Sequence, residues 1–316
     1  MAKKRKEILF CDYYDEWIEL YKVGAIAEIT LKKYYQTAKV LREFCPKLLV
    51  SDFDRKEYQR LINEYAKTHE KQTTIDFHHQ VKACIKDMYH DGLLKNDPTY
   101  RAVMKGTASM RSKKKKFLQL EELQKLLRSL DLSNEISRDW FILLVAKTGM
   151  RYAEALALTP ADFNWTENTL SINKTWDYKN AKGGFKATKT AGSVRTIKVD
   201  WQIVGQFKPV VEKLPEAEPI FIEKDDLGHY KRQFNSVINN YLSGKCKALG
   251  ITVISLHALR HTHASVLLAE GVSINTISAR LGHADVGVTQ ETYAHVLDEL
   301  QKKDDQKMMS VLMQIA

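Results

Sequence analysis

The sequence has few cysteines and no long apolar segment. Its four cysteines are spread over 316 residues and form no C-x-x-C pair, which argues against a zinc ribbon or a disulfide scaffold and suits a reducing compartment. The longest mainly apolar run, residues 140–146, has seven residues, whereas a membrane-spanning helix needs about 20. The basic N-terminus lacks the apolar core of a signal peptide. We therefore expect a cytoplasmic protein that does not enter a membrane.

Acidic residues are fewer than basic ones. Lysine and arginine total 49 and aspartate and glutamate total 39, which gives a net charge of +10. Counted along the chain, residues 1–110 contribute +4, residues 111–120 contribute +5 and residues 121–316 contribute only +1. Charge concentrated in this way favours a polyanionic partner, most simply nucleic acid. The alternative is a basic protein whose charge only keeps it in solution.

Four amphipathic helices are predicted in the first third of the chain. Apolar residues recur at helical spacing over residues 10–23, 30–44, 55–68 and 73–90. Thr30 is the predicted N-cap of the second helix. Because a chain of this length suggests two domains, we assign residues 1–105 to a helical first domain.

A basic segment follows this domain. Residues 106–116 have no hydrophobic periodicity, and five of the six residues 111–116 are basic. Charge repulsion favours an extended interdomain linker. We predict that its lysines lie on a DNA backbone; the alternative is a solvated, nuclear-import-like patch. The lysines concerned are Lys113, Lys114, Lys115 and Lys116.

The remainder, residues 117–316, is the second predicted domain. Helical patterns cover residues 120–130, 138–147 and 152–158, and β-rich segments cover residues 169–175, 184–190 and 194–199. We expect the β-rich segments to form three short antiparallel strands, and the rest to be mainly helical. The predicted fold class is therefore mainly α with a small antiparallel β-sheet, divided into a helical domain and a mixed α+β domain.

Histidines cluster near the C-terminus. His257 and His261 are four residues apart and would share a helix face, as the zinc ligands of a metalloprotease do. Such a site needs glutamate directly after the first histidine, where this sequence has Ala258, and no nearby carboxylate completes a ligand set. We therefore expect neither a metal nor another cofactor.

The same region suits phosphate chemistry. His257 and Arg260 are three residues apart, so they project from one helical face. A guanidinium binds phosphate oxygens through a planar fork and stays charged, and an imidazole transfers protons near neutral pH. A second arginine, Arg151, follows a glycine turn, and a tyrosine can act as a covalent nucleophile. These residue types together indicate a phosphodiester-cleaving centre.

In this order and spacing the residues resemble the tyrosine recombinases, in particular the integrases of phages and conjugative transposons. The matching segments are TGMRYAEALALTPADF around Arg151, ATKTAGSVRTI around Lys189, LHALRHTHASVLLAEGVSINTISARLGH up to His283, and TQETYAHV around Tyr293. They span most of residues 118–298. The four N-terminal helices are similar, less specifically, to the core-binding domain of that family.

The resemblance implies a role for each matching residue. Tyr293 corresponds to the nucleophile that forms a 3′-phosphotyrosyl link to DNA. Arg151 and Arg260 correspond to the pair that grips the non-bridging oxygens of the phosphate. His257 corresponds to the histidine that assists proton transfer at the tyrosine, and His283 to a second position that hydrogen-bonds at the phosphate. Such a reaction stores the bond energy in the phosphotyrosine and needs neither ATP nor a metal.

Two further roles are implied near the predicted strands. Lys189 matches the lysine that protonates the leaving 5′-hydroxyl, although Lys182 and Lys186 lie in the same region and leave that choice open. Glu154, three residues after Arg151, matches an acidic residue that supports the site without reacting.

The other C-terminal histidines and the C-terminal tail are expected to have structural roles. His261 and His263 are expected to be packing or capping groups of their helix, and His295 a structural residue. Residues 299–316 are predicted to form an amphipathic tail helix. In the family such tails dock on a neighbouring protomer of a tetramer, which we favour here; the alternative is that the tail closes its own domain.

These observations predict a site-specific DNA recombinase, an integrase that integrates or excises a mobile element in a bacterial cytoplasm. The alternatives are a resolvase or type IB topoisomerase-like strand transferase, and a DNA-binding regulator without cleavage. Expected partners are double-stranded DNA at attachment or transposon-end sites, further copies in a homotetramer, and an excision factor. Many integrases carry an additional N-terminal module for arm-type sites, whereas the helices here begin within about ten residues of Met1. We expect a protein that works without arm sites, or a shortened chain.

Overall fold

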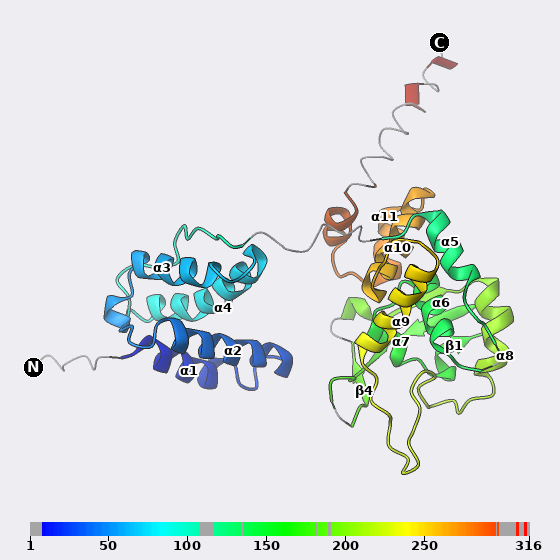
Figure 1. Ribbon diagram of the computed structural model, residues 1–316, viewed down its shortest axis with the longest axis horizontal. Helices are drawn as coiled ribbons and strands as arrows, with labels where there is room; N and C mark the ends of the chain where they lie inside the picture. Colours follow the sequence, from blue (N-terminus) through cyan, green and yellow to red (C-terminus); the bar gives the residue numbers. More distant parts are fainter. Residues whose placement is uncertain are drawn as a thin grey trace, which may run out of the picture. The chain divides into compact units, whose positions relative to one another are not determined.

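The computed structural model divides the chain into two compact units, residues 1–113 and 114–316. It describes residues 8–107, 117–133, 135–180, 182–188, 191–294 and 296, together with 308–309 and 313–314. The linker lysines, Lys189, His295 and most of the tail lie outside the described residues. Figure 1 shows the helices and strands of both units.

The first unit is helical, as the sequence predicts. It consists of α1 (Phe10–Tyr21), α2 (Glu28–Phe44), α3 (Arg55–Ala66) and α4 (Lys71–His90). The predicted N-cap of α2 was wrong, because that helix begins at Glu28, two residues before Thr30. Its N-cap is Ala27, whose carbonyl accepts a hydrogen bond from the Thr30 amide.

Aromatic side chains fill the core of this unit. Tyr14 and Trp17 of α1 and Tyr58 of α3 are almost fully buried. The Trp17 indole donates to the Asp87 carboxylate at 2.7 Å and thereby joins α1 to α4. The Tyr58 hydroxyl lies 2.6 Å from Nδ1 of His78, which joins α3 to α4. These polar contacts satisfy the buried donors and orient the helices.

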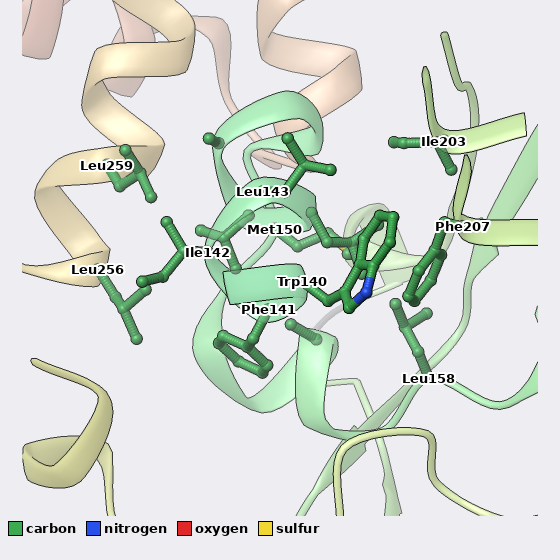
Figure 2. Packing of buried hydrophobic residues seen from close by; sticks show 14 of the residues in the cluster. Trp140, Phe141, Ile142, Leu143, Met150, Leu158, Ile203, Phe207, Leu256 and Leu259 are labelled. Carbon is green, nitrogen blue, oxygen red and sulfur yellow. The ribbon is translucent and has the colours of Figure 1, made fainter. Parts of the chain in front are cut away.

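The second unit is built around one buried helix. Its helices are α5 (Leu120–Arg128), α6 (Arg138–Thr148), α7 (Tyr152–Leu156), α8 (Lys208–Val211), α9 (Asn235–Ala248), α10 (Leu256–Ala269) and α11 (Ile274–Leu281). Figure 2 shows Ile142 of α6 facing Leu256 and Leu259 of α10, while Trp140 faces Phe207. Because α6 is apolar on all sides, it is enclosed by its neighbours.

The strands differ in part from the prediction. They are β1 (Phe163–Asn164), β2 (Thr169–Ile172), β3 (Lys174–Trp176), β4 (Phe185–Ala187) and β5 (Arg195–Lys198). Two small antiparallel sheets form, with orders β1-β2-β5 and β3-β4. The first predicted strand is interrupted at Asn173, so that its two halves pair with different partners. The predicted small antiparallel sheet is present, but as two separate sheets.

Candidate active site

A helix cap and a glycine turn position the ends of the helices that carry the site. Ser255 caps α10 by accepting a hydrogen bond from the Ala258 amide. At the end of α6, Gly149 has φ +67° and a left-handed conformation. A Cβ atom at this glycine would approach His263 and Leu281 to 2.8 Å each. The glycine therefore allows α6 to end against α10 and α11, and places Arg151 at the start of α7.

Arg260 lies at the centre of this arrangement and is only 3% exposed. Its guanidinium donates to the carbonyl oxygens of Gly149 and Leu281 at 2.6 and 2.7 Å. It also lies 2.9 Å from Nε2 of His283. Burial and the nearby Arg151 lower the pKa of Arg260 to about 9, so it remains cationic at neutral pH. Its fork is held by two separate segments of the chain, the turn after α6 and the end of α11.

Arg151 and Glu154 form a second part of the site. The Arg151 guanidinium donates to the Glu154 carboxylate at 2.7 Å and to the Gly282 carbonyl at 3.3 Å. Its side chain is 40% exposed, whereas that of Glu154 is 1% exposed. Burial alone would raise the pKa of Glu154, but the hydrogen bond from Arg195 and the charge of Arg151 hold it below its usual value. Glu154 therefore positions Arg151 as a charged support.

Arg195 is a buried residue of the site that the sequence interpretation missed. It lies on β5 with its side chain 6% exposed, and it donates to Glu154 at 2.8 Å. It also donates to the Arg280 carbonyl at 2.7 Å. The only signal in the sequence was an arginine inside a β-rich segment, which on its own suggests a surface ion pair. Its burial beside the site appears only once β5 is placed against α11.

His283 is held as a neutral imidazole. Its Nε2 accepts from Arg260, so its Nδ1 hydrogen is directed to the Thr289 hydroxyl at 2.7 Å. Burial and the charge of Arg260 lower its pKa to about 4. His257 is exposed on α10, one turn from the buried Arg260. Arg151, Arg260, His257 and His283 therefore lie in one region.

Tyr293 is buried at the edge of this region. It is 2% exposed and packs with a small apolar cluster from α10 and α11. Its hydroxyl lies 2.9 Å from Nδ1 of His261. The expectation that His261 only packs or caps its helix was wrong. The residue one position after Arg260 is directed at Tyr293 because α10 turns about 100° per residue.

His263 agrees with its structural interpretation. Its Nδ1 hydrogen is donated to the Ala146 carbonyl at 2.9 Å, and its Nε2 accepts from Nε of Arg280 at 3.1 Å. Burial and the charge of Arg280 lower its pKa to about 3. The neutral ring thus joins α10 to α6 and α11.

This burial predicts a pH dependence of stability. The pKa of His263 is lower in the folded chain than the usual value near 6.5, so the unfolded chain binds an extra proton as pH falls below about 6.5. We expect His263 alone to cost about 2 kcal/mol of unfolding free energy between pH 7 and pH 5. Urea unfolding of the wild type and of His263→Gln, at both pH values, measures this. The loss should be smaller in the variant, and equal losses would contradict the assignment.

Several predicted residues cannot be placed in the site. Lys189, His295 and the four linker lysines lie outside the described residues. Lys186, on β4, forms an ion pair with Asp177 at 2.6 Å. Within the described parts of the chain, no group of three histidine, cysteine, aspartate or glutamate side chains could hold a metal ion. The helices in those same parts include none that is both long and apolar enough to cross a membrane.

Comparison with known proteins agrees with this geometry. The model of the phage integrase family matches residues 116–299. The integrase of Staphylococcus phage L54a is 27% identical over 97% of this chain and 94% of its own length. The ICEBs1 integrase of Bacillus subtilis strain 168 is 25% identical over 71% of this chain and 61% of its own length.

Solved structures show the same fold. The Tn1549 transposon integrase, solved as residues 82–397 in complex with circular intermediate DNA, has a TM-score of 0.74 at 15% identity. The alignment covers 94% of this chain and 98% of that one. A lambda integrase dimer bound to a COC′ core site has a TM-score of 0.64 at 15% identity, over 91% of this chain and 77% of that one.

The fold and the arginine–histidine–tyrosine site define a tyrosine recombinase. Because the family match spans more than half of the chain, the protein belongs to the phage integrase family. Its relatives include phage and ICEBs1 integrases and the tyrosine recombinase XerD of Listeria innocua. The chain is accordingly an enzyme of site-specific DNA recombination, of the type found in phages and conjugative transposons.

Proposed function

We propose that this enzyme cleaves and rejoins DNA strands through a 3′-phosphotyrosyl intermediate on Tyr293. One observation carries the proposal: the Arg260 guanidinium is buried among carbonyl oxygens and His283, with no carboxylate among its hydrogen-bond partners in the part of the chain that the structure describes. A buried cation in this state has no anion in direct contact, because Glu154 acts on it only from a longer range. A phosphate group would supply one.

The charge of the whole site fits a phosphodiester. Arg151, Arg195 and Arg260 carry three positive charges and Glu154 carries one negative charge, so the four side chains leave +2. A bound phosphodiester contributes −1, and its pentavalent transition state approaches −2. Arginines fixed before the reaction stabilise that added charge without reorganising. The site is therefore matched more closely to the transition state than to the substrate.

Each side chain of the site has a separate role in this reaction. Arg260 and the more exposed Arg151 bind the non-bridging oxygens, and Glu154 and Arg195 hold Arg151 in place. His283 keeps Arg260 oriented and lies beside the same phosphate, with the exposed His257 near it. Lys189 protonates the 5′-oxygen as it leaves. Tyr293 attacks the phosphorus and holds the 3′ end until the new strand arrives.

The substrate is double-stranded DNA, held by both units. The Tn1549 and lambda integrases were solved with DNA, and the fold is shared with them. In this proposal residues 1–105 bind the core site, residues 106–116 lie on the DNA backbone, and residues 117–316 cleave it. Four protomers assemble on paired attachment or transposon-end sites, their tails (residues 299–316) exchanged between neighbours, and an excision factor sets the direction.

A chelator experiment tests the proposal. A nicked suicide half-site, from which the fragment beyond the cleavage point diffuses away, should trap a covalent protein–DNA adduct. We expect the same adduct yield in excess EDTA as in magnesium, because arginines neutralise the phosphate. Denaturing gel electrophoresis of labelled DNA measures the yield. Failure to form any adduct on a DNA end that the protein binds, or loss of the adduct in EDTA, would contradict the proposed chemistry.

The linker assignment has its own test. Replacing Lys113–Lys116 with alanine should weaken binding about equally on target and random DNA, because phosphate contacts carry affinity but little sequence information. The slope of log affinity against log salt should become shallower by about 0.9 per lost contact. Replacing Lys224 and Lys231, which are paired with glutamates, is the matched control. An unchanged slope in the linker variant would place its lysines in solvent.

A further inference from the structure

The contact between His261 and Tyr293 gives α10 a second histidine at the reacting group. His257 and His261 lie one turn apart on α10, with ring centres 4.7 Å apart and planes almost perpendicular. The sequence interpretation assigned proton transfer at the tyrosine to His257. In the structure it is His261 whose Nδ1 lies 2.9 Å from the Tyr293 hydroxyl.

The attack on phosphorus needs a proton acceptor at this place. Burial raises the pKa of Tyr293 to about 12, and the charge of Arg260 opposes this only in part. At neutral pH the hydroxyl is therefore protonated, and its proton must leave as the new bond forms. A general base must lie within hydrogen-bond reach of that proton, at about 2.6–3.2 Å. The His261 imidazole meets this requirement, and its position on a long helix fixes it relative to Arg260.

We propose that His261 is the proton acceptor for Tyr293, an inference that rests on Tyr293 being the nucleophile. During cleavage the Tyr293 oxygen bonds to phosphorus, the bond from phosphorus to the 5′-oxygen breaks, and the tyrosine proton moves to Nδ1 of His261. The 5′-oxygen leaves with the electron pair and takes its proton from a separate donor, Lys189 in the function proposed above. In rejoining, the 5′-hydroxyl attacks phosphorus and gives its proton back to that donor. The bond from phosphorus to the Tyr293 oxygen breaks, and His261 returns its proton to the departing tyrosine oxygen.

A sulfur substitution in the DNA separates the two proton transfers. Replacing the bridging 5′-oxygen with sulfur creates a leaving group that needs no acid, but leaves the attack by Tyr293 unchanged. Single-turnover adduct formation is measured on both substrates with His261→Ala and Lys189→Ala. We expect His261→Ala to be slower by about 10²- to 10³-fold on both substrates. Lys189→Ala should be slow on the oxygen substrate and recover with sulfur.

Two further measurements distinguish chemistry from packing. Added imidazole should raise the cleavage rate of His261→Ala at least tenfold, which a purely structural role would not allow. His261→Gln keeps a hydrogen-bond acceptor of similar reach but has no basic nitrogen, so its cleavage should remain slow. Because the glutamine side chain fills the space that alanine leaves open, added imidazole should not raise the rate of this variant. The exposed His79→Ala on α4 is the matched control and should behave as wild type throughout. Half-site affinity confirms that each variant is folded.

The results distinguish failure of the role proposed for His261 from failure of the proposed function. If Tyr293→Phe still forms the adduct, the nucleophile is elsewhere and both proposals fall. If Tyr293→Phe is inactive but His261→Ala and His261→Gln cleave at rates within about threefold of wild type, only the role of His261 is overturned. The role of His261 is also overturned if the sulfur substrate restores the cleavage rate of His261→Ala. It is likewise overturned if added imidazole restores the rate of His257→Ala and not that of His261→Ala.

Discussion

Tyr293→Phe should abolish the covalent adduct while leaving DNA affinity nearly unchanged. The substitution removes the attacking oxygen and keeps the ring that packs against Leu281 and Ile277. The lost hydrogen bond is the one to His261. Because catalysis would lose its nucleophile, we expect adduct formation on the suicide half-site to fall below detection, at least about 10⁴-fold.

Binding measurements provide the control for this variant. The phenylalanine side chain preserves the apolar contacts, so stability should change little, and half-site binding in a mobility-shift assay should stay within about twofold. Adduct that persists in Tyr293→Phe would move the nucleophile to another residue. Loss of binding together with the adduct would mean that the hydroxyl has a structural role.

Arg260→Lys is expected to have the next largest effect. Lysine keeps the positive charge but lacks the planar fork, so it cannot contact Gly149, Leu281 and a phosphate oxygen together. Removing one preorganised donor of this kind costs about 10²- to 10³-fold in rate. We expect single-turnover cleavage to fall by about 10³-fold or more at saturating protein, with weaker half-site binding as a smaller second effect.

Arg280→Lys is the matched control for Arg260→Lys. Arg280 also donates to two backbone carbonyls, those of Lys147 and Lys198, and to a histidine. The Arg280→Lys variant therefore loses a similar set of structural hydrogen bonds but no proposed phosphate contact. Both variants should lower the unfolding temperature, and only Arg260→Lys should lower the cleavage rate sharply. Equal losses of rate in the two variants would make Arg260 a packing residue.

The helices and the order of the site residues could be predicted from the sequence. Helical periodicity identified α1 to α6 to within a few residues, because these amphipathic or buried segments are long enough to show it, whereas the five-residue α7 was predicted two residues too long. The spacing from His257 to Arg260 placed these two residues on one helix face, and the resemblance to the tyrosine recombinases implied that Arg151 joins them. Local signals of this kind do not depend on distant partners.

The pairings between distant segments could not be predicted in this way. The break at Asn173 divides one β-rich run between two sheets, and the register that pairs β2 with β5 depends on tertiary packing. Arg195 and His261 were missed for the same reason. Each looks like an ordinary surface or packing residue until the fold brings it against Glu154 or Tyr293.

The most direct test of the account is to identify the residue that carries the DNA. The adduct trapped on a nicked half-site is digested with nuclease and trypsin and sequenced by mass spectrometry. The tryptic peptide 281–302 contains one tyrosine, Tyr293, together with His283 and His295. We expect an acid-stable nucleotide adduct on Tyr293. An adduct on any other residue, or an acid-labile one on a histidine of the same peptide, would contradict it.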